Sequence, residues 1–522
     1  MELFHQIIHP IFLLLLILTI IFSRVRDRKT GHRRRTLPPS AGRKLPVIGH
    51  LHHFLTTRQL PHRLLRDLAR KHGDVISLDL GEIRHVVISS AEAAREVMRT
   101  HDIKFAQRPR HPQQAKVMYG GVDLIYAPYG EYWRQLRRIA TLELLTARRV
   151  DSFRRVREAE VSGLVRQIGD LATTPVARPI DLTRMLFDLT YRIISKATFG
   201  DVSREQEEFI KAAEEVVEYA GGFKIAFLFP SSGLVQSLFG TEELLERFHK
   251  GLDMLAESLI GQHRARRRIK PARDQKCRKE DHEDLLDVLL NLQEDEATLG
   301  FHLSTDAIKA FIVDIFMAGS ETPSALIEWT MSEMMRNPEV MRKAQSEVRG
   351  LFGERGKVEE ADISRLTYMK LVIKETLRLH TPAPLALPRE CREECQVGGY
   401  DVDLKTRVLV NVWAIARDPR YWGDDAEKFL PDRFLDSKVN FGGTHFEFLP
   451  FGAGRRMCPG INFGLAAVEL PLANLLFHFD WKLPHGVEPA SFDMDEQFGV
   501  TLRRKNHLEL TPVVRYNPLP VV

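Results

Sequence analysis

The sequence predicts a mainly α-helical protein with a minor β part, folded as one large domain behind an N-terminal transmembrane anchor. The chain has 522 residues, of which 44% are hydrophobic, so it can bury a large core. Much of it has the apolar spacing of helices, whereas strand-like runs are few and short. One stretch near the N-terminus is long and apolar enough to cross a bilayer.

The anchor is predicted by the segment from Leu3 to Phe22, which is nearly all Leu, Ile and Phe. Basic residues follow it, from Arg24 to Arg35, and none precedes it, so the positive-inside rule leaves the rest of the chain in the cytosol. A cleaved signal peptide would need a basic leader and a small-residue cleavage site, and neither is visible. We therefore expect residues 1–36 to form a signal anchor with a basic stop-transfer block.

The prolines that follow the basic block predict a stiff hinge between the anchor and the body. Pro38, Pro39 and Pro46 favour extended backbone and cannot continue a helix. No second linker of this kind, repeat or low-complexity tract is visible before the C-terminus. Residues 37–522 are therefore predicted to form a single domain.

The clearest helix is predicted from about Ser304 to Arg336. Its apolar residues recur with the i, i+3, i+4 spacing of a helix, and Asn337 and Pro338 provide a stop. At 1.5 Å per residue it would be about 45 to 50 Å long, so it must pass through the core. The predicted strands are short and cover residues 75–80, 86–88 and 407–412.

Charge and cysteine content exclude some classes of protein. The formal net charge is only +5, so we expect no nucleic-acid partner. The four cysteines are too few and too scattered for a disulfide framework, which indicates a reducing compartment. Cys391 and Cys395 are expected to be surface thiols, because no histidine partners for zinc are evident. The basic run His263 to Lys270 and the acidic run Glu280 to Asp287 are expected to be solvated.

The strongest chemical signal is the loop at residues 450–460, Pro-Phe-Gly-Ala-Gly-Arg-Arg-Met-Cys-Pro-Gly. A cysteine that ligates iron needs a backbone that comes close to the metal, and glycines on both sides of Cys458 allow it. Backbone N–H groups directed at the sulfur would stabilise the thiolate. The apolar helix predicted after it, at 461–477, would point its positive N-terminal dipole at the same atom. The alternative is a buried free cysteine in a glycine-rich turn.

A carboxylate and a guanidinium are spaced three residues apart at Glu375 and Arg378, on one helical face. The same spacing occurs at three other places, and each is predicted to be an exposed pair on a helix: Glu92 and Arg95, Glu96 and Arg99, and Glu333 and Arg336. What distinguishes Glu375 and Arg378 is their order, because Pro431-Asp432-Arg433-Phe434 and then the cysteine loop follow them.

The long helix contains Ala318-Gly319-Ser320-Glu321-Thr322-Pro323. The small pair Ala318 and Gly319 lets a bulky planar group approach the backbone, and Thr322 offers a hydroxyl in an apolar helix. Pro323 lacks an N–H, so the helix is expected to open at Gly319. The alternative is an incidental kink in a core helix.

These motifs, in this order, resemble the cytochrome P-450 superfamily. Its cysteine loop is F-x-x-G-x-R-x-C-x-G, matched here at Phe451, Gly454, Arg456, Cys458 and Gly460. The resemblance implies the fold of that superfamily, with a haem whose iron is ligated by the Cys458 thiolate. It also implies a structural triad of Glu375, Arg378 and Arg433, although Asp432 stands where the family usually has Glu.

The resemblance further implies the roles of other residues. Glu321 and Thr322 match the proton-delivery pair of the oxygen-activation motif, with Pro323 replacing the commoner Thr or Ser. The haem carboxylates would be held by Trp133, Arg137, Arg389 and Arg456. Several mostly aliphatic residues would face the substrate, namely Ala318, Ala383, Leu385, Ala386, Leu387 and Val500.

The implied activity is a monooxygenase that takes electrons from NADPH through a membrane-bound reductase and hydroxylates a small apolar molecule. Within the superfamily the chain resembles plant microsomal terpenoid oxidases, which implies a single-pass protein of the endoplasmic reticulum membrane in specialised metabolism. Aromatic substrates such as phenylpropanoids remain an alternative. So do a haem-thiolate isomerase or dehydratase that needs no dioxygen, and a membrane-tethered helical scaffold without a cofactor.

Overall fold

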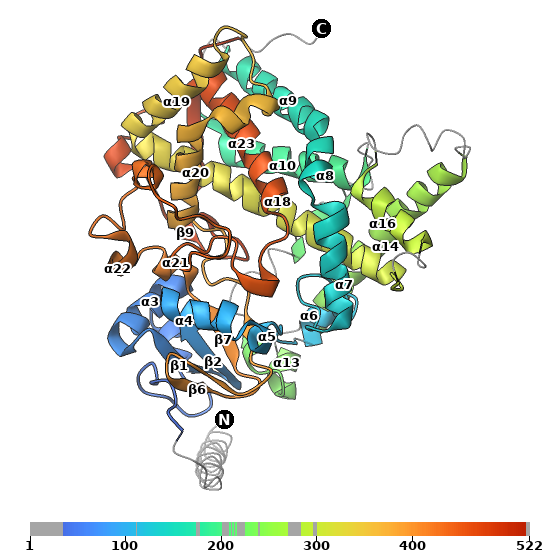
Figure 1. The fold of residues 1–522 in the computed structure, drawn as a ribbon, viewed down its shortest axis with the longest axis vertical. Helices are drawn as coiled ribbons and strands as arrows, with labels where there is room; N and C mark the ends of the chain where they lie inside the picture. Colours follow the sequence, from blue (N-terminus) through green and yellow to red (C-terminus); the bar gives the residue numbers. More distant parts are fainter. Residues whose placement is uncertain are drawn as a thin grey trace, which may run out of the picture.

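The structure is a computed structural model that describes residues 35–110, 112–173, 178–200, 208–209, 211–212, 215–216, 225–238, 241–269, 283–295 and 300–517. The predicted anchor, the basic block up to residue 34, and Cys277 lie outside the described residues. The rest is a large helical part beside a smaller sheet part (Figure 1). The prediction of a mainly α fold with a minor β part is therefore confirmed.

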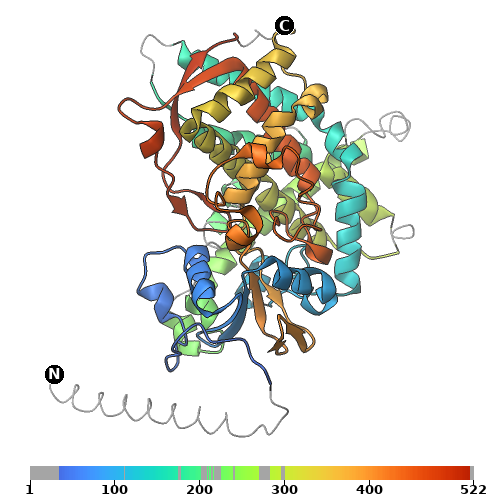
Figure 2. The same ribbon diagram turned by 60° about the vertical axis from the view of Figure 1, so that its left-hand side comes forward.

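The main sheet has the strand order β1-β2-β7-β4, where the strands are β1 (Val75–Leu80), β2 (Ile83–Ile88), β7 (Arg407–Val410) and β4 (Arg389–Glu390). β1 pairs antiparallel with β2, β2 pairs parallel with β7, and β4 pairs antiparallel with β7. Figure 2 shows this sheet at one end of the molecule, below the helices. The pairing brings β4, and with it Arg389, to the edge of the sheet.

The other strands form three small sheets, of which two lie beside the helical part and the third, the hairpin of residues 395–402, lies beside the main sheet (Figure 1). β3 (Ile180–Asp181), β11 (Glu509–Val514) and β8 (Phe479–Lys482) make one, β9 (Glu496–Gln497) and β10 (Arg503–Arg504) a second, and β5 (Cys395–Val397) and β6 (Tyr400–Val402) a hairpin. These short strands follow the helices in the chain and hold their connections in place.

The long helix α18 (Thr305–Arg336) crosses the middle of the helical part (Figure 1). The Ser304 hydroxyl caps it by accepting a hydrogen bond from the Ala307 N–H at 3.1 Å, and the helix ends before Pro338, as the sequence predicts. α10 (Leu182–Phe199) and α23 (Ile461–His478) pack against it. α18 and α23 are apolar enough to cross a membrane, but most of each is buried inside the molecule, so they are core helices.

The remaining helical segments surround this centre. They are α2 (His52–Leu55), α3 (Pro61–His72), α4 (Ala91–Arg95), η1 (Glu96–Thr100), α5 (Asp102–Phe105), α6 (Pro112–Val117), α7 (Glu131–Ile139), η2 (Ala140–Leu144), α8 (Ala147–Ser152), α9 (Arg154–Ala172), α12 (Ile225–Leu228), α13 (Gly233–Leu238), α14 (Thr241–Ile269), α16 (Leu285–Glu294), α19 (Pro338–Phe352), η3 (Glu360–Arg365), α20 (Thr367–Leu379), α21 (Val412–Ile415), α22 (Pro419–Trp422), η4 (Pro431–Phe434), η5 (Gly454–Arg456) and η6 (Pro489–Ser491).

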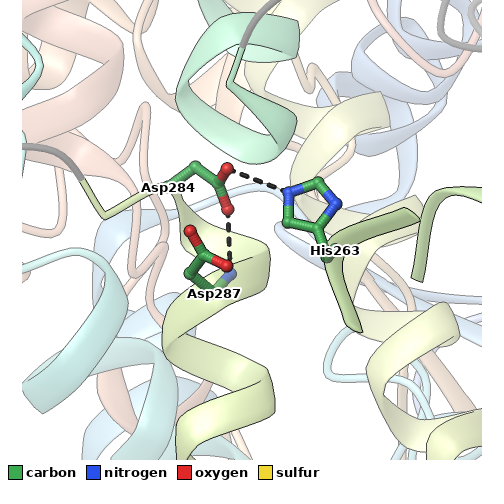
Figure 3. A group of neighbouring side chains, drawn as sticks. All are labelled: His263, Asp284 and Asp287. Carbon is green, nitrogen blue, oxygen red and sulfur yellow. Dashed lines mark hydrogen bonds and ion pairs between the residues drawn. The ribbon is translucent and has the colours of Figure 1, made fainter. Parts of the chain in front are cut away.

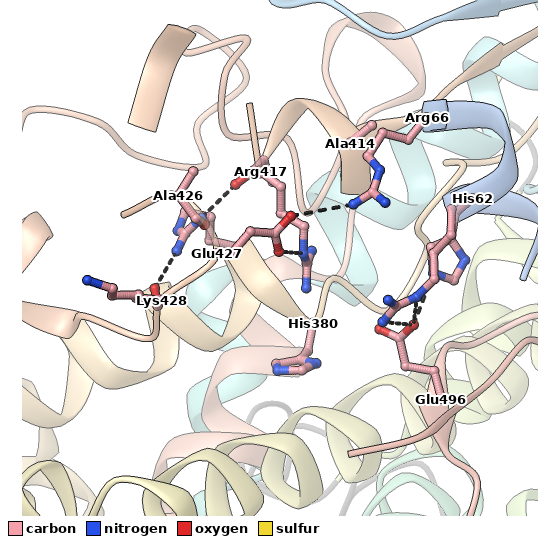
Figure 4. Close-up of polar contacts among 12 residues, drawn as sticks. His62, Arg66, His380, Ala414, Arg417, Ala426, Glu427, Lys428 and Glu496 are labelled. Atoms are coloured by element: carbon pink, nitrogen blue, oxygen red, sulfur yellow. Dashed lines mark hydrogen bonds and ion pairs between the residues drawn. The ribbon is translucent and has the colours of Figure 1, made fainter. Parts of the chain in front are cut away.

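A polar network ties the N-terminal helix α3 to segments from the second half of the chain (Figure 4). The imidazole of His62 lies 3.1 Å from the Glu496 carboxylate, and both groups are buried. Glu427 accepts hydrogen bonds from Arg66 at 3.4 Å and from Arg417 at 3.1 Å. Because burying an unpaired charge is costly, these pairs fix how α3 sits on the helical part.

Candidate active site

Cys458 lies in the loop between η5 and α23, where its backbone is held in place by hydrogen bonds. Its N–H donates to the Phe451 carbonyl at 3.0 Å. Burial raises the pKa of the Cys458 thiol above its ordinary value, while a hydrogen bond from the backbone of Gly460 and the charge of Arg137 act to lower it. The Gly460 N–H and the Arg137 guanidinium are therefore the two groups that would stabilise a thiolate at this position.

Gly454 shows why the loop needs glycine. Its φ is +71°, and a Cβ there would lie 2.2 Å from the Met98 carbonyl oxygen and 2.6 Å from an Asp102 carboxylate oxygen. Both contacts are far shorter than a carbon can make, so no other residue fits. The cysteine loop is therefore packed directly against η1 and α5.

Arg456 anchors the same loop to the segment that precedes α7. Its guanidinium donates to the carbonyls of Ala106 at 2.8 Å and Ala127 at 2.6 Å. It also lies over the indole ring of Trp133, 4.1 Å from the ring centroid. Trp133 in turn donates its ring N–H to the Leu124 carbonyl at 3.0 Å, so the two predicted residues form one unit.

Arg389 is buried at the edge of the sheet beside the cysteine loop. It donates to the Ala453 carbonyl at 2.8 Å and lies 3.3 Å from Asp102. Asp102 is shared, because Arg455 also binds it at 2.9 Å. Burial lowers the pKa of Arg389, and the charge of Asp102 offsets part of that effect.

The arginines around the loop carry more positive charge than the neighbouring carboxylates balance. Burial, followed by the charges of Arg108 and Arg389, lowers the pKa of Arg456 to about 8, although Asp123 opposes this. Burial and Arg389 lower the pKa of Arg108 to about 9. Burial also lowers the pKa of Arg137, which faces Cys458. An anion placed among these guanidinium groups would relieve their repulsion.

This arrangement fits the haem that the sequence motifs imply. A haem carries two carboxylates at one edge and an iron at its centre, and the chain supplies a cluster of arginines together with a buried thiol. Arg108, Arg137, Arg389 and Arg456 could hold the carboxylates, and Cys458 could ligate the iron. The donor chemistry therefore matches both parts of the cofactor.

The loop that supplies carbonyls to Arg456 is fixed from the other side by Asp314 of α18. The buried Asp314 carboxylate accepts hydrogen bonds from the N–H groups of Leu124 at 2.7 Å and Ile125 at 3.1 Å. Burial raises its pKa well above the ordinary value, with the charge of Asp123 adding to the effect. Asp314 thus connects the arginine cluster to α18, the helix on which the oxygen-activation motif is expected.

The middle of α18 has an exposed face although the rest of the helix is buried. Ala318 is exposed, and Met317, Gly319 and Thr322 are half-buried, whereas the residues from Ala307 to Phe316 and from Pro323 to Met335 are buried. α18 runs unbroken through Pro323, so the expected opening at Gly319 does not interrupt the helix. This stretch of α18 is therefore partly accessible. A Cβ at Gly319 would lie 2.9 Å from the Cδ1 atom of Ile194, so this glycine serves close packing against α10.

Glu321 and Thr322 lie on this stretch with different partners. The Thr322 hydroxyl donates to the Ala318 carbonyl at 2.8 Å, which leaves its lone pairs available to a ligand or water. The buried Glu321 carboxylate forms an ion pair with Arg503, whose side chain is 34% exposed. Arg503 also lies over the ring of Phe187, 4.6 Å from its centroid. Glu321 thus connects the inner face of α18 to a partly solvated arginine.

Glu375, Arg378 and Arg433 are brought together as the resemblance implies. Arg378 makes two hydrogen bonds of 2.8 Å to Glu375, and Arg433 donates to the same carboxylate at 2.9 Å. Arg378 also donates to the carbonyls of Ala416 at 2.7 Å and Ala426 at 2.6 Å. These bonds tie α20 to the segment that leads to the cysteine loop.

The other three glutamates with this spacing have partners distant in the sequence. Glu92 accepts a hydrogen bond from the Tyr421 hydroxyl, and Glu96 accepts one from the Gly398 N–H at 2.8 Å. Glu333 is not part of an exposed helix pair, because its side chain is buried and its carboxylate lies 2.7 Å from the imidazole of His380. The ring of His380 stacks on Trp329 with centroids 4.2 Å apart. Tertiary contact with a histidine 47 residues away replaces the local pairing that the spacing suggests.

The predicted substrate-facing residues fall into two groups. Ala318 and Val500 are exposed, and Ala383, Ala386 and Leu387 are half-buried. Leu385 is instead buried in the cluster that covers the sheet, together with Leu80 and Leu409.

Sequence reasoning missed three residues of the site: Arg108, Asp314 and Arg503. Asp314 could have been found, because a carboxylate between Val313 and Ile315 on a core helix needs a partner. Arg108 and Arg503 carry no such signal, since isolated arginines are usually surface residues.

A second cluster, of His263, Asp284 and Asp287, could hold a metal ion by distance alone, because its ligand atoms lie within 4.8 Å of one another (Figure 3). Asp284 instead caps α16 by accepting the Asp287 N–H at 2.8 Å, and its other oxygen lies 3.0 Å from His263. Arg266 also lies 3.0 Å from the imidazole, where a cation would be repelled. The expectation that both charged runs are solvated is wrong at His263 and Asp284, which are buried.

Comparison with known proteins agrees with this geometry. The family model described as Cytochrome P-450 matches residues 38–509. Desmethyl-deoxy-podophyllotoxin synthase from Sinopodophyllum hexandrum is 48% identical over 96% of each chain. Salviol synthase from Salvia pomifera is 44% identical over 95% of each chain, and germacrene A hydroxylase from Saussurea costus is 44% identical over 95% of this chain and 97% of its own.

A solved structure shares the fold at low sequence identity. The zebrafish cytochrome P-450 with abiraterone has a TM-score of 0.71 and 24% identity, over 88% of this chain and 100% of its own. The family match covers most of the chain, and the relatives cover nearly all of it. The protein therefore belongs to the cytochrome P-450 family of haem-thiolate monooxygenases.

Proposed function

We propose that the protein hydroxylates a plant terpenoid in an NADPH- and dioxygen-dependent reaction of specialised metabolism. The observation that carries this proposal is the similarity to salviol synthase and germacrene A hydroxylase, each over 95% of the chain. The largely aliphatic residues predicted to face the substrate agree with a terpenoid skeleton, because they offer apolar contact and few charges.

A bound haem would supply the reductive activation of dioxygen, and a thiolate ligand would favour cleavage of the O–O bond. Cys458 would be that thiolate ligand. Arg137, Arg389 and Arg456, with Trp133 stacked on Arg456, would hold the haem carboxylates, and Arg108 would join them. Arg108 and Arg389 are buried and Arg137 and Arg456 are half-buried, so their contacts with a carboxylate would be stronger than in water.

Thr322 and Glu321 would supply protons to the oxygen-binding side. The Thr322 hydroxyl can accept a hydrogen bond from water while it donates to Ala318. The ion pair between Glu321 and Arg503 places a carboxylate between this hydroxyl and a side chain that is 34% exposed. A proton taken from solvent could therefore reach Thr322 through Glu321 and ordered water.

Ala318 would set the closest approach of the substrate to the oxygen-binding face of α18. Ala383, Ala386, Leu387 and Val500 would form the apolar walls around it. Leu385, which is buried under the sheet, would act by holding this segment in place rather than by touching the substrate.

The predicted anchor would hold the enzyme in the endoplasmic reticulum membrane as a single-pass protein, with the domain from residue 37 onwards in the cytosol. That orientation gives a membrane-bound NADPH-dependent reductase access to the domain. It also lets an apolar substrate reach the site from the bilayer, where such molecules concentrate.

The second candidate substrate class is aromatic and of the phenylpropanoid type. The similarity to desmethyl-deoxy-podophyllotoxin synthase, at 48% identity, favours it. Substrates of both classes would be oxidised by the same haem chemistry. The shape of the apolar walls of the site would decide which class binds.

The test is turnover of a panel of terpenoid and phenylpropanoid substrates by microsomes that contain this protein and a plant reductase. Hydroxylated terpenoids that form only with NADPH and dioxygen would support the proposal. Products from aromatic substrates alone would favour the second class. A product that forms without NADPH would overturn the monooxygenase reaction in favour of isomerisation or dehydration.

A further inference from the structure

Two of the four cysteines, Cys391 and Cys395, lie together on a different loop from Cys458. Cys391 follows β4 directly, and Cys395 is the first residue of β5. In the β5–β6 hairpin Cys395 is paired with Val402, and the sulfur of Cys391 lies 3.8 Å from the Val402 carbonyl oxygen. The turn between the two cysteines thus brings both of them next to Val402.

The two thiols differ in exposure. Cys391 is fully buried, which corrects the prediction of a surface thiol, and its sulfur lies 3.0 Å from the Glu393 carbonyl oxygen. Cys395 is half-buried and packs against the same hydrophobic cluster. Both are free thiols, so reagents from solvent would reach Cys395 before Cys391.

Charge makes Cys395 the more reactive of the two. The neighbouring Cys391 thiol lowers the pKa of Cys395, and Cys395 in turn raises the pKa of Cys391. Burial opposes the effect at Cys395, the ammonium of Lys104 adds to it, and the carboxylates of Glu393 and Glu96 oppose it. Lys104 is held beside the turn by an ion pair of 2.6 Å with Glu393. A thiolate is the nucleophilic form of cysteine, so attack would begin at Cys395.

We propose that Cys391 and Cys395 form a reversible redox site that is oxidised to a disulfide by hydrogen peroxide. The Cys395 sulfur attacks one oxygen of the peroxide, the O–O bond breaks, and a sulfenic acid and one water form. The Cys391 sulfur then attacks the Cys395 sulfur, and the S–O bond breaks with release of a second water. Two thiols and one peroxide thus become one disulfide and two waters.

The turn that carries the two cysteines lies next to Arg389 and is held by backbone hydrogen bonds. The Arg392 N–H donates to the Lys104 carbonyl at 2.9 Å, and the Glu390 N–H donates to the Gln107 carbonyl at 2.9 Å. The turn between the cysteines is therefore held by the same α5 region that contacts Arg389. A disulfide between cysteines four residues apart would close a short loop within this turn.

The experiment treats the full-length holoenzyme in membranes with hydrogen peroxide, blocks the remaining thiols with N-ethylmaleimide and digests the protein with trypsin. Arg392 lies between the cysteines, so trypsin separates them into peptides 390–392 and 393–405. The expected product is the two peptides joined, with a mass equal to their sum less two hydrogens. Dithiothreitol should return both to the thiol form.

Two substitutions test the order of events. In Cys391→Ser the sulfenic acid at Cys395 should persist and be trapped by dimedone, whereas in Cys395→Ser the Cys391 thiol should stay unmodified. Lys104→Gln should slow alkylation of Cys395 severalfold, while the matched control Lys343→Gln, at an exposed lysine that pairs with Asp432, should not. The lysine comparison remains informative if either cysteine variant fails to fold.

The proposal is overturned if both peptides are fully alkylated after peroxide treatment, or if Cys395 is joined to Cys277 or to a second chain instead of Cys391. It is also overturned if Lys104→Gln leaves the alkylation rate of Cys395 unchanged.

Discussion

The guanidinium of Arg456 lies over the indole ring of Trp133, 4.1 Å from the ring centroid, and this contact joins the cysteine loop to α7. The same α7 carries Arg137, whose charge acts on the Cys458 thiol. One stacked pair therefore fixes the distance between the iron ligand and the cations expected to hold the haem carboxylates.

Replacement of Arg456 by lysine should lower haem occupancy severalfold. Lysine keeps the charge but cannot donate to the Ala106 and Ala127 carbonyls at once or stack on Trp133 in the same way. Occupancy is measured as Soret absorbance per mole of purified protein. The matched control is Arg134→Lys on the exposed side of α7, which should keep full occupancy. Equal occupancy in both variants would contradict this role of Arg456.

Replacement of Arg378 by lysine should destabilise the protein by about 3 to 5 kcal/mol, because it leaves the Glu375 carboxylate partly unpaired in the core. The expected result is a large loss of folded protein, measured by urea unfolding and by yield. Arg336→Lys is the control, since Arg336 has the same spacing from a glutamate but is exposed. It should change stability by less than about 0.5 kcal/mol.

Glu321→Gln should reduce turnover by about 10²-fold, because an amide cannot pass on a proton. The ratio of product formed to NADPH oxidised should fall with it, since electron supply does not depend on this side chain. Thr322→Val should act in the same direction. Glu339→Gln, at an exposed glutamate, is the control and should leave the ratio unchanged. An unchanged ratio in Glu321→Gln would exclude it from proton supply.

The stability of the protein should depend on the ionisation of Glu328. Burial raises its pKa from 4.5 to about 7, while a hydrogen bond from Thr183 opposes the shift. Because the folded-state pKa is the higher one, this stabilisation is complete below the unfolded pKa and is lost as the pH rises towards 7. Glu328→Gln should make the free energy of unfolding depend less on pH. It should remove a change of the order of 3 kcal/mol in that free energy between the unfolded-state and folded-state pKa values.

The measurement is the urea midpoint of the wild type and of Glu328→Gln at about pH 5 and about pH 7.5. The wild type should lose stability relative to the variant at the higher pH. A difference between the two proteins that stays constant with pH would refute the prediction.

Local patterns predicted the elements that position the site. The apolar spacing of residues 304–336 predicted α18, and Asn337 and Pro338 predicted its C-terminal end. The glycines around Cys458 indicate a loop with close backbone contacts, and Gly454 makes such a contact with Met98. These features depend on residues near one another in the sequence.

Contacts between segments that are distant in the sequence could not be predicted from the sequence. Arg108 donates to the carbonyl of Leu387, 279 residues away, and Arg503 pairs with Glu321, 182 residues away. Spacing carries no information about such pairs, and an isolated arginine reads as a surface residue. The burial of Leu385 likewise depends on how the segment packs on the sheet, and the local sequence of residues 383–387 does not predict that packing.

The central claim is that the Cys458 sulfur ligates the haem iron. Its most direct test is the spectrum of the reduced protein with carbon monoxide, for the wild type, Cys458→Ala and the control Cys395→Ser. The wild type and Cys395→Ser should show the thiolate-type Soret band, and Cys458→Ala should lack it. A folded wild-type protein that binds no iron porphyrin, or that binds one through a histidine, would contradict the account.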